Sequence, residues 1–246
     1  MYYYIYDPLL ANKKNFNSVA KIETRLTDLG INGKINYLSF LKNIYQVLDE
    51  EIKKGLETLV VVGNDKTFIK IVNLVADLGL VVGFIPFGEP NLIAQLLGIP
   101  TGEAACDTLS SRIIERLDLG QINNYYFITS LECDGKDVIL ECDNNYFISP
   151  QTKNSRVTIS NLDVYDGSII RPEDGQFDVF IKTGNGGWFK KPGEVSRFNA
   201  KRIKITSQGS VPILLKDEER IIKTPAEVRI IPKKIKIIVG KNRQLK

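Results

Sequence analysis

The sequence predicts two domains of different fold class, α/β plus all-β. An N-terminal parallel α/β three-layer domain is expected over residues 1–115, followed by a C-terminal antiparallel β-sandwich over residues 116–246. Three observations lead to this prediction. The 246 residues are enough for one large domain or two modest ones. Strand-like and helix-like segments alternate in the first half, and beyond about residue 116 only short strand-like runs follow.

The first half contains four strand–helix units in a row, the pattern that favours a parallel sheet. Strands are expected at residues 2–6, 31–38, 59–62 and 80–85, and the helices after them end near Gly30, Gly55, Gly79 and Gly98. The run Leu59–Val62 is continuous and apolar, which is typical of a strand buried on both faces.

The second half contains short apolar runs separated by Gly, Pro, Asn and Asp, the pattern of an antiparallel sandwich. Strands are expected at residues 124–132, 136–141, 146–149, 156–160, 177–182, 202–206, 211–215 and 228–239.

The composition excludes several function classes. The chain has no histidine, which removes Ser-His-Asp and Cys-His catalysis and every His-ligated metal site. Three cysteines without C-x-x-C spacing suit a reducing cytosol, and no apolar stretch approaches the length of a membrane span. The N-terminus shows no signal-peptide pattern, so we expect a cytoplasmic protein. Because histidine is absent, any catalysis must use carboxylates, lysines and backbone amides.

Positive charge is concentrated in the last third of the chain. Residues 182–246 carry 17 Lys and Arg against 5 Asp and Glu, whereas residues 1–181 carry 16 against 24. Such a basic segment attracts an anionic partner. Among specific partners, we favour an anionic membrane surface that the protein contacts peripherally. A solvated basic face without a specific partner is the equally weighted alternative. Nucleic acid is disfavoured because few aromatic residues are available there to stack on bases.

Two loops are candidates for binding an anion. In the first, residues 63–67 (Gly-Asn-Asp-Lys-Thr) join the buried strand to a helix, whose first amides and dipole attract negative charge. An ordinary capped turn is the alternative for this segment. The second loop, residues 85–100, again contains the end of a strand, a Gly turn and the start of a helix. Neighbouring parallel strands bring such loops to the same edge of a sheet, where ligands bind.

These segments carry a resemblance to the diacylglycerol kinase catalytic-domain family, which includes bacterial lipid kinases and sphingosine kinases and is related to NAD kinases. Residues 63–67 resemble the family's Gly-Gly-Asp-Gly-Thr, and residues 85–100 resemble Ile-Pro-x-Gly-Thr-x-Asn-x-x-Ala followed by Leu-Gly-Ile-Pro. Residues 172–178 look like its Pro-x-Asp-Gly-x-Leu/Phe-Asp, and residues 217–219 like its late Asp-Gly-Glu. The resemblance implies a diacylglycerol kinase/NAD kinase-like fold for the chain.

The resemblance also implies site residues. The nucleotide, ATP, would be held by Gly63, Asp65, Lys66, Thr67, Gly88 and Asn91. Asp174 would contribute to a Mg²⁺ network, Asp217 would be the base that accepts the proton of a lipid hydroxyl, and Glu219 would act beside it. Without the resemblance, a hairpin turn at Asp174 and a solvated charged loop at Asp217 would be the simpler interpretations.

The sequence departs from the family pattern at Asn64, Lys66, Glu89, Pro90 and Glu218. Glycine in a phosphate loop lets the backbone approach the anion closely, and a side chain crowds that approach. Lys66 could instead offer the phosphates a positive charge.

Three functions therefore stay open. The leading hypothesis is a lipid-kinase-like phosphotransferase that moves the γ-phosphate of ATP to a lipid hydroxyl such as that of diacylglycerol. The second is a catalytically inactive relative that binds a nucleotide or an anionic lipid, and the third is phosphorylation of NAD. A homodimer is an open alternative for the assembly.

Overall fold

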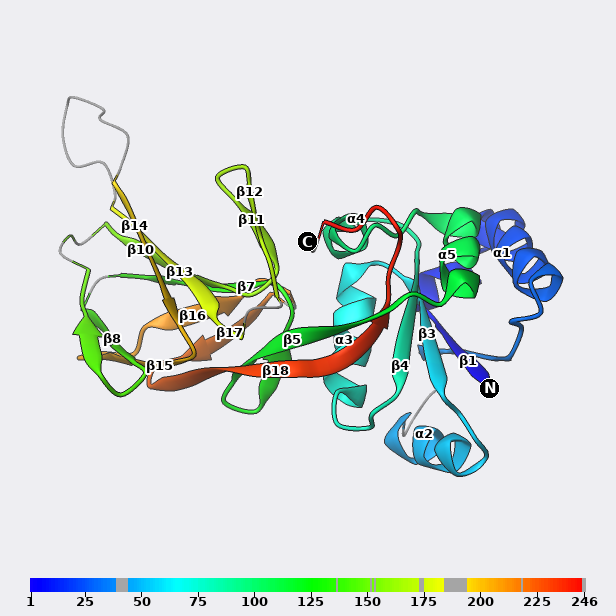
Figure 1. The fold of residues 1–246 in the computed structure, drawn as a ribbon, viewed down its shortest axis with the longest axis horizontal. Coiled ribbons are helices and arrows are strands. Elements are labelled where there is room, and N and C mark those ends of the chain that lie inside the picture. The colour runs from blue at the N-terminus through cyan, green and yellow to red at the C-terminus, as the bar shows by residue number, and fades with distance from the viewer. Residues whose placement is uncertain are drawn as a thin grey trace. The chain divides into compact units, whose positions relative to one another are not determined.

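The computed structural model describes residues 1–38, 44–135, 137–150, 152, 154–172, 175–183, 194–217 and 219–244. The chain forms two compact units (Figure 1). The first unit comprises Met1–Leu117 and Lys234–Lys246, and the second comprises Asp118–Lys233. None of the described helices combines the length and the apolar composition needed to span a bilayer.

The first unit is a parallel sheet with helices, as the sequence predicts. Its strands and helices are β1 (Tyr2–Tyr6), α1 (Phe16–Asp28), β2 (Lys34–Tyr37), α2 (Ile44–Lys53), β3 (Thr58–Gly63), α3 (Asp65–Val75), β4 (Val81–Pro86), α4 (Leu92–Leu96) and α5 (Ala105–Ser111). Short 3-10 helices lie at Pro8–Ala11, Lys13–Asn15 and Gly102–Ala104. The strands are ordered β2-β1-β3-β4, each parallel to the next.

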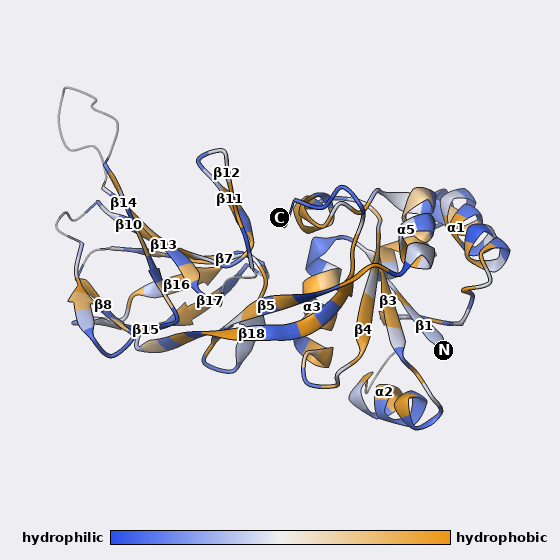
Figure 2. Cartoon of the chain, in the orientation of Figure 1, coloured by the Kyte–Doolittle hydropathy of each residue, from blue (hydrophilic) through white to orange (hydrophobic). Residues whose placement is uncertain are grey.

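The strands at the centre of this sheet are buried along their whole length. Every residue of β3 and β4 is buried, and Figure 2 shows both strands as predominantly apolar. The helices end where the sequence places a glycine, because Gly30, Gly55 and Gly79 adopt positive φ angles of 66°, 91° and 70°. Helix α5 is an addition that the alternating pattern did not predict.

The second unit is an antiparallel β-sandwich. Its strands are β5 (Ile114–Ile122), which begins in the first unit, β6 (Tyr125–Phe127), β7 (Ser130–Asp134), β8 (Val138–Cys142), β9 (Tyr146–Ile148), β10 (Arg156–Ser160), β11 (Asp163–Tyr165), β12 (Ser168–Ile170), β13 (Phe177–Lys182), β14 (Val195–Ala200), β15 (Arg202–Ser207), β16 (Pro212–Leu215), β17 (Arg220–Lys223) and β18 (Ala226–Ile238). One layer has the order β14-β13-β10-β7-β16-β17, and the other contains β18-β15-β8-β9.

The two layers of the second unit enclose a continuous apolar core. Strands of both layers contribute to it, including Leu131 and Val157 from one layer and Leu140 and Ile203 from the other. The predicted strand at residues 124–132 is in fact divided into β6 and β7. The three cysteines are buried free thiols.

The last strand corrects the expected domain boundary. We expected the whole of 116–246 to belong to the second domain, but residues 234–246 belong to the first unit. The reason is that β18 is long enough to serve both sheets. Its first half pairs antiparallel with β15, as Arg229 lies opposite Arg202, and its end adds parallel to β4, as Lys236 lies opposite Val81.

Candidate functional site

The two candidate loops meet at the carboxyl edge of the parallel sheet. Strands β3 and β4 are in parallel register with Gly63 opposite Pro86, so both loops begin at the same level. Immediately beyond this pair, the Phe87 amide donates to the Gly63 carbonyl over 2.6 Å. The convergence predicted from the strand–helix pattern is confirmed.

Three further hydrogen bonds join the two loops. The side-chain amide of Asn64 donates to the Glu89 carbonyl over 3.0 Å, and the Asp65 amide donates to the Pro90 carbonyl over 2.9 Å. The Asp65 carboxylate accepts from the Ile93 amide at 3.0 Å, near the start of α4. Asp65 is 5% exposed, so its carboxylate fixes the second loop against the first from a buried position.

Asn64 also closes the start of helix α3. Its Oδ1 accepts from the Thr67 amide at 3.1 Å, which makes it the N-cap. In a glycine-containing loop that amide would be open to a phosphate. Here an anion must displace the Asn64 side chain to reach it.

Thr67 is held by a residue that the motif comparison did not single out. Its hydroxyl donates to Oδ2 of Asp7, whose Oδ1 accepts from the Leu9 amide at 2.8 Å. A Cβ on Gly63 would lie 3.0 Å from the Asp7 Cβ and 3.2 Å from the Thr67 Cβ, so glycine is needed where these side chains meet. Asp7 ends the first parallel strand, and that position was the signal that could have identified it.

The remaining nucleotide candidates differ in exposure. Asn91 is buried; its amide nitrogen donates to Glu89 Oε1 over 3.2 Å and its oxygen accepts from Gln95 at 2.7 Å. Gly88 is exposed with a φ of 82°, a conformation that favours glycine. Lys66 is exposed on the first turn of α3. The structure thus brings Gly63, Asp65, Thr67, Gly88 and Asn91 to one edge, with Lys66 as a cation beside it.

In the second unit, Asp217 lies in the turn between β16 and β17 and is 5% exposed. Its carboxylate accepts from the Ile128 amide at 2.6 Å and from the Thr129 amide at 3.2 Å, and the Thr129 hydroxyl also donates to it. Burial raises the pKa of the Asp217 carboxyl from its ordinary 3.8 to about 6, and the hydrogen bonds from Thr129 and Ile128 oppose this rise. A carboxyl with such a pKa is suited to accept a proton near neutral pH.

A polar cluster that the sequence did not reveal lies near Asp217. The Ser130 hydroxyl donates to Asp163 Oδ2 over 2.6 Å, and Lys216 Nζ lies 2.7 Å from Glu132 Oε1 and 3.7 Å from Asp163 Oδ2. The charge of Asp163 contributes to the raised pKa of Asp217. These residues are on different strands, and only the fold brings them together.

Of the other two predicted residues, the structure describes Glu219 alone. Glu219 is exposed and has a φ of 53°, whereas Asp217 is buried, so the two carboxylates do not share an environment. Asp174 lies outside the described residues. Its neighbour Gly175 donates its amide to Asp118 over 2.9 Å, and the other Asp118 oxygen accepts from the Lys233 amide at 2.7 Å.

Within the described ranges, no group of three carboxylate or cysteine side chains is placed to hold a metal ion. Asp118 accepts one backbone amide on each of its two oxygens.

Comparison with known proteins agrees with the fold and with the first motif region. Residues 2–122 match the model of the diacylglycerol kinase catalytic domain. The match covers 121 of the 246 residues. The diacylglycerol kinase of Bacillus subtilis (strain 168) is 26% identical over 128 residues, which are 50% of this chain and 42% of that protein. The chain therefore matches less than half of the length of this relative.

Solved structures resemble the chain over nearly its whole length. A putative diacylglycerol kinase from Bacillus anthracis str. Sterne superposes with a TM-score of 0.80 at 18% identity, covering 98% of both chains. A second structure, of a diacylglycerol kinase from the same organism, gives 0.79 at 16% identity and covers 98% of this chain and 97% of that one. At these identities the likeness establishes the fold, including the sandwich that lies beyond the family match.

Proposed function

We propose that the chain is a lipid-kinase-like phosphotransferase that moves the γ-phosphate of ATP to the hydroxyl of a diacylglycerol-like lipid. The observation that carries this proposal is the pair of joined loops at the carboxyl edge of the sheet, within the residues that match the model of the diacylglycerol kinase catalytic domain. Phosphoryl transfer depends mainly on positioning the phosphates and on neutralising their charge. Both loops lie at the carboxyl edge of the parallel sheet, where ligands bind, and each leads into a helix whose first backbone amides face that edge.

The nucleotide site is assigned to the first unit. Gly88 leaves room for the phosphates, since no atom lies within 4 Å of a Cβ placed there, and Lys66 supplies positive charge to them. Gly63 acts by letting Asp7 and Thr67 approach each other. Asp65 and Thr67 act through hydrogen bonds that hold their loop against a neighbouring segment, whereas the hydrogen bonds of Asn91 order the second loop itself. ATP brings its Mg²⁺ as part of the substrate complex, and Asp174 is the residue that we predict to contribute to its binding.

The acceptor hydroxyl is assigned to the second unit. Asp217 takes the proton of the attacking hydroxyl, for which its raised pKa is suitable. Glu219 lies in the same turn and is the second carboxylate that we predict to take part in this step. The Thr129 hydroxyl occupies one Asp217 oxygen, so the lipid hydroxyl must compete with it for that atom. We propose that the protein works in the cytoplasm and touches an anionic membrane surface, where such a lipid resides.

A second candidate function is supported by two of these contacts. Asn64 occupies the Thr67 amide that a phosphate would use, and Asp217 is already hydrogen-bonded through both oxygens. Both contacts are expected in a catalytically inactive relative that binds nucleotide or anionic lipid without turnover.

The deciding experiment is a transfer assay with ATP labelled at the γ-phosphate. Purified protein is incubated with Mg²⁺ and diacylglycerol in mixed micelles, with NAD as an alternative acceptor in a parallel reaction. We expect label in the lipid and none in NAD, and we expect Asp217→Asn to abolish transfer while its circular dichroism stays that of a folded protein. Absence of transfer from folded protein that still binds ATP would favour the inactive relative.

A further inference from the structure

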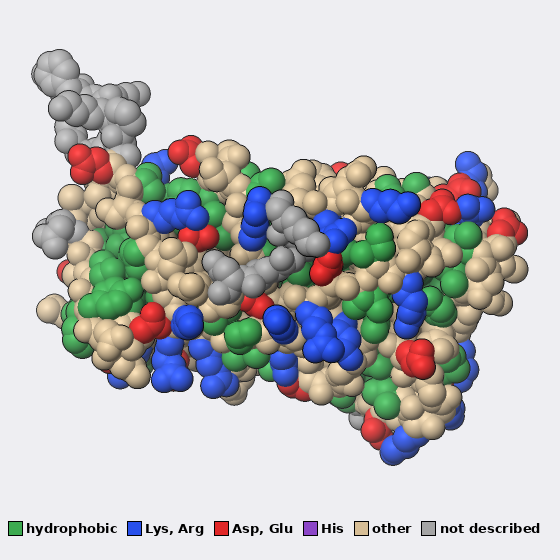
Figure 3. Space-filling model, viewed as in Figure 1, with side chains coloured by type: hydrophobic (Ala, Val, Ile, Leu, Met, Phe, Trp, Pro, Cys, Tyr) green, Lys and Arg blue, Asp and Glu red, His purple; other side chains and the backbone are tan. Residues whose placement is uncertain are grey.

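The second unit carries a groove of about 730 Å³ that none of the described residues assigned above to nucleotide or acceptor lines. It is lined by the start of β15, by the middle of β18 and by the turn after β8. On the face shown in Figure 3, Lys and Arg side chains gather over β15 and β18. The groove is a separate feature from the turn that holds Asp217.

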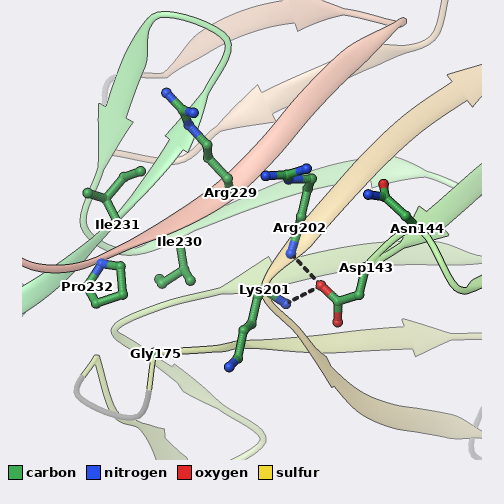
Figure 4. Close-up of a pocket in the computed structure, with 9 residues that line it drawn as sticks. All are labelled: Asp143, Asn144, Gly175, Lys201, Arg202, Arg229, Ile230, Ile231 and Pro232. Carbon is green, nitrogen blue, oxygen red and sulfur yellow. Dashed lines mark hydrogen bonds between the residues drawn. The ribbon is translucent and has the colours of Figure 1, made fainter.

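Three cationic side chains, Lys201, Arg202 and Arg229, line this groove. Figure 4 shows Arg202 and Arg229 pointing to one side of the strands and Lys201 to the other, and Ile231 and Pro232 add apolar surface to the lining. A site that combines several cations with adjoining apolar surface is suited to a ligand that has an anionic group and a hydrophobic part.

The pairing of the strands places two of these cations side by side. Arg202 on β15 lies directly opposite Arg229 on β18, and both are exposed. Like charges directly opposite each other on one face of a sheet destabilise it. An anion bound between the two guanidinium groups would remove that repulsion, and two guanidinium groups match the oxygens of a phosphate.

Among the described residues, Asp143 and Glu227 bring carboxylates to these cations. The Asp143 carboxylate is engaged by backbone, since its Oδ1 accepts from the amides of Lys201 at 3.0 Å and Arg202 at 2.8 Å (Figure 4). Arg202 Nε lies 3.7 Å from Glu227 Oε1, whereas Arg229 Nε donates over 2.8 Å to the neutral side chain of Gln121. Among the described residues, no carboxylate lies within 4.0 Å of the charged groups of Lys201 or Arg229.

We propose that this groove binds the phosphate group of an anionic amphiphile. Arg202 and Arg229 contact the phosphate from neighbouring strands, and Ile231 and Pro232 contact its apolar part. The phosphate chemistry is the same whether it belongs to a phospholipid headgroup in a bilayer or to a soluble phosphate ester. This binding requires no phosphotransfer and is therefore independent of the activity proposed above.

The test compares two charge-neutralised variants of the full chain. Arg202→Gln with Arg229→Gln removes the two facing charges from the groove. Lys182→Gln with Lys223→Gln removes two exposed charges from the other sheet of the same unit and serves as the matched control. Circular dichroism establishes that each variant is folded.

Co-sedimentation is measured with vesicles of phosphatidylcholine alone and of phosphatidylcholine mixed with phosphatidylglycerol. We expect binding only to the mixed vesicles, and weakening with salt. Each cation near an anionic surface accounts for about a fivefold change in binding, so the groove variant should bind about 25-fold more weakly. The control variant should lose at most a few-fold.

Calorimetric titration with glycerol phosphate separates the two sources of the phosphate. Soluble phosphate binding that the groove variant abolishes would support the groove as a phosphate site even without vesicle binding. Equal losses in both variants would overturn the proposal, because net charge alone would then explain the attraction. It would also be overturned if the unaltered protein bound neither mixed vesicles nor glycerol phosphate.

Discussion

Replacement of Asp217 by Asn should change the way in which the stability of the protein depends on pH. The carboxyl is buried, and this burial raises its pKa to about 6. Asn has nearly the same shape but does not titrate. The difference in stability between the two proteins therefore isolates the protonation of this one carboxyl.

The sign and the size of the effect follow from the raised pKa. Between about pH 4 and pH 6 the folded state binds a proton at Asp217 that the unfolded chain has released, so the free energy of unfolding falls as the pH rises. The change from 3.8 to about 6 corresponds to about 3 kcal/mol, at about 1.36 kcal/mol per pKa unit. This stabilisation is fully present below pH 3.8 and is lost as the pH rises through 6.

The measurement is urea unfolding followed by circular dichroism, for the unaltered protein and for Asp217→Asn, at several pH values from about 4 to 7. The stability of the unaltered protein relative to the variant should fall by about 3 kcal/mol across this range. A difference that stays constant would show that the carboxyl is not desolvated. A difference that increases with pH would show that the hydrogen bonds to Thr129 and Ile128 outweigh burial.

Three further substitutions test individual contacts. Thr129→Val removes a hydroxyl that stabilises the ionised form of Asp217, so the pKa of Asp217 should rise. The acid limb of the pH profile of kcat/KM for phosphotransfer should then move to higher pH, and an unmoved profile would exclude Asp217 as the base. Asn64→Gly removes the helix cap, which should lower stability by only a few tenths of a kcal/mol and tighten ATP binding measured by calorimetry; weaker ATP binding would contradict the crowding assigned to this side chain. Gly63→Ala should cost about 1–3 kcal/mol in urea unfolding because its Cβ would crowd two side chains within 3.2 Å, whereas Gly209→Ala, with no atom within 4 Å of its Cβ, should cost much less; equal costs would refute the crowding.

Local patterns were sufficient to predict much of the fold. The apolar run Leu59–Val62 is the buried part of β3, and glycines end α1, α2 and α3 because only glycine readily adopts the positive φ found there. The meeting of the two loops also followed from the order of strands and helices. Each of these features depends on residues that are close in sequence.

Features that depend on distant residues were missed. The link between Asp7 and Thr67 spans 60 residues, and the donors to Asp217 lie 88 and 89 residues away from it. Strand β18 returns to the first unit because its C-terminal end pairs with β4. The sequence of β18 itself does not indicate this pairing. A sequence motif therefore indicated which residues to examine, while burial and hydrogen-bond partners depended on the tertiary fold.

The proposed kinase activity requires that the joined loops of the first unit hold the phosphates of a nucleotide. Calorimetric titration of the purified protein with ATP, with and without Mg²⁺, tests it directly. We expect Mg²⁺-dependent binding that weakens with salt and is reduced in Lys66→Gln. If folded protein bound no ATP in either condition, the nucleotide site and the kinase proposal that depends on it would both be wrong.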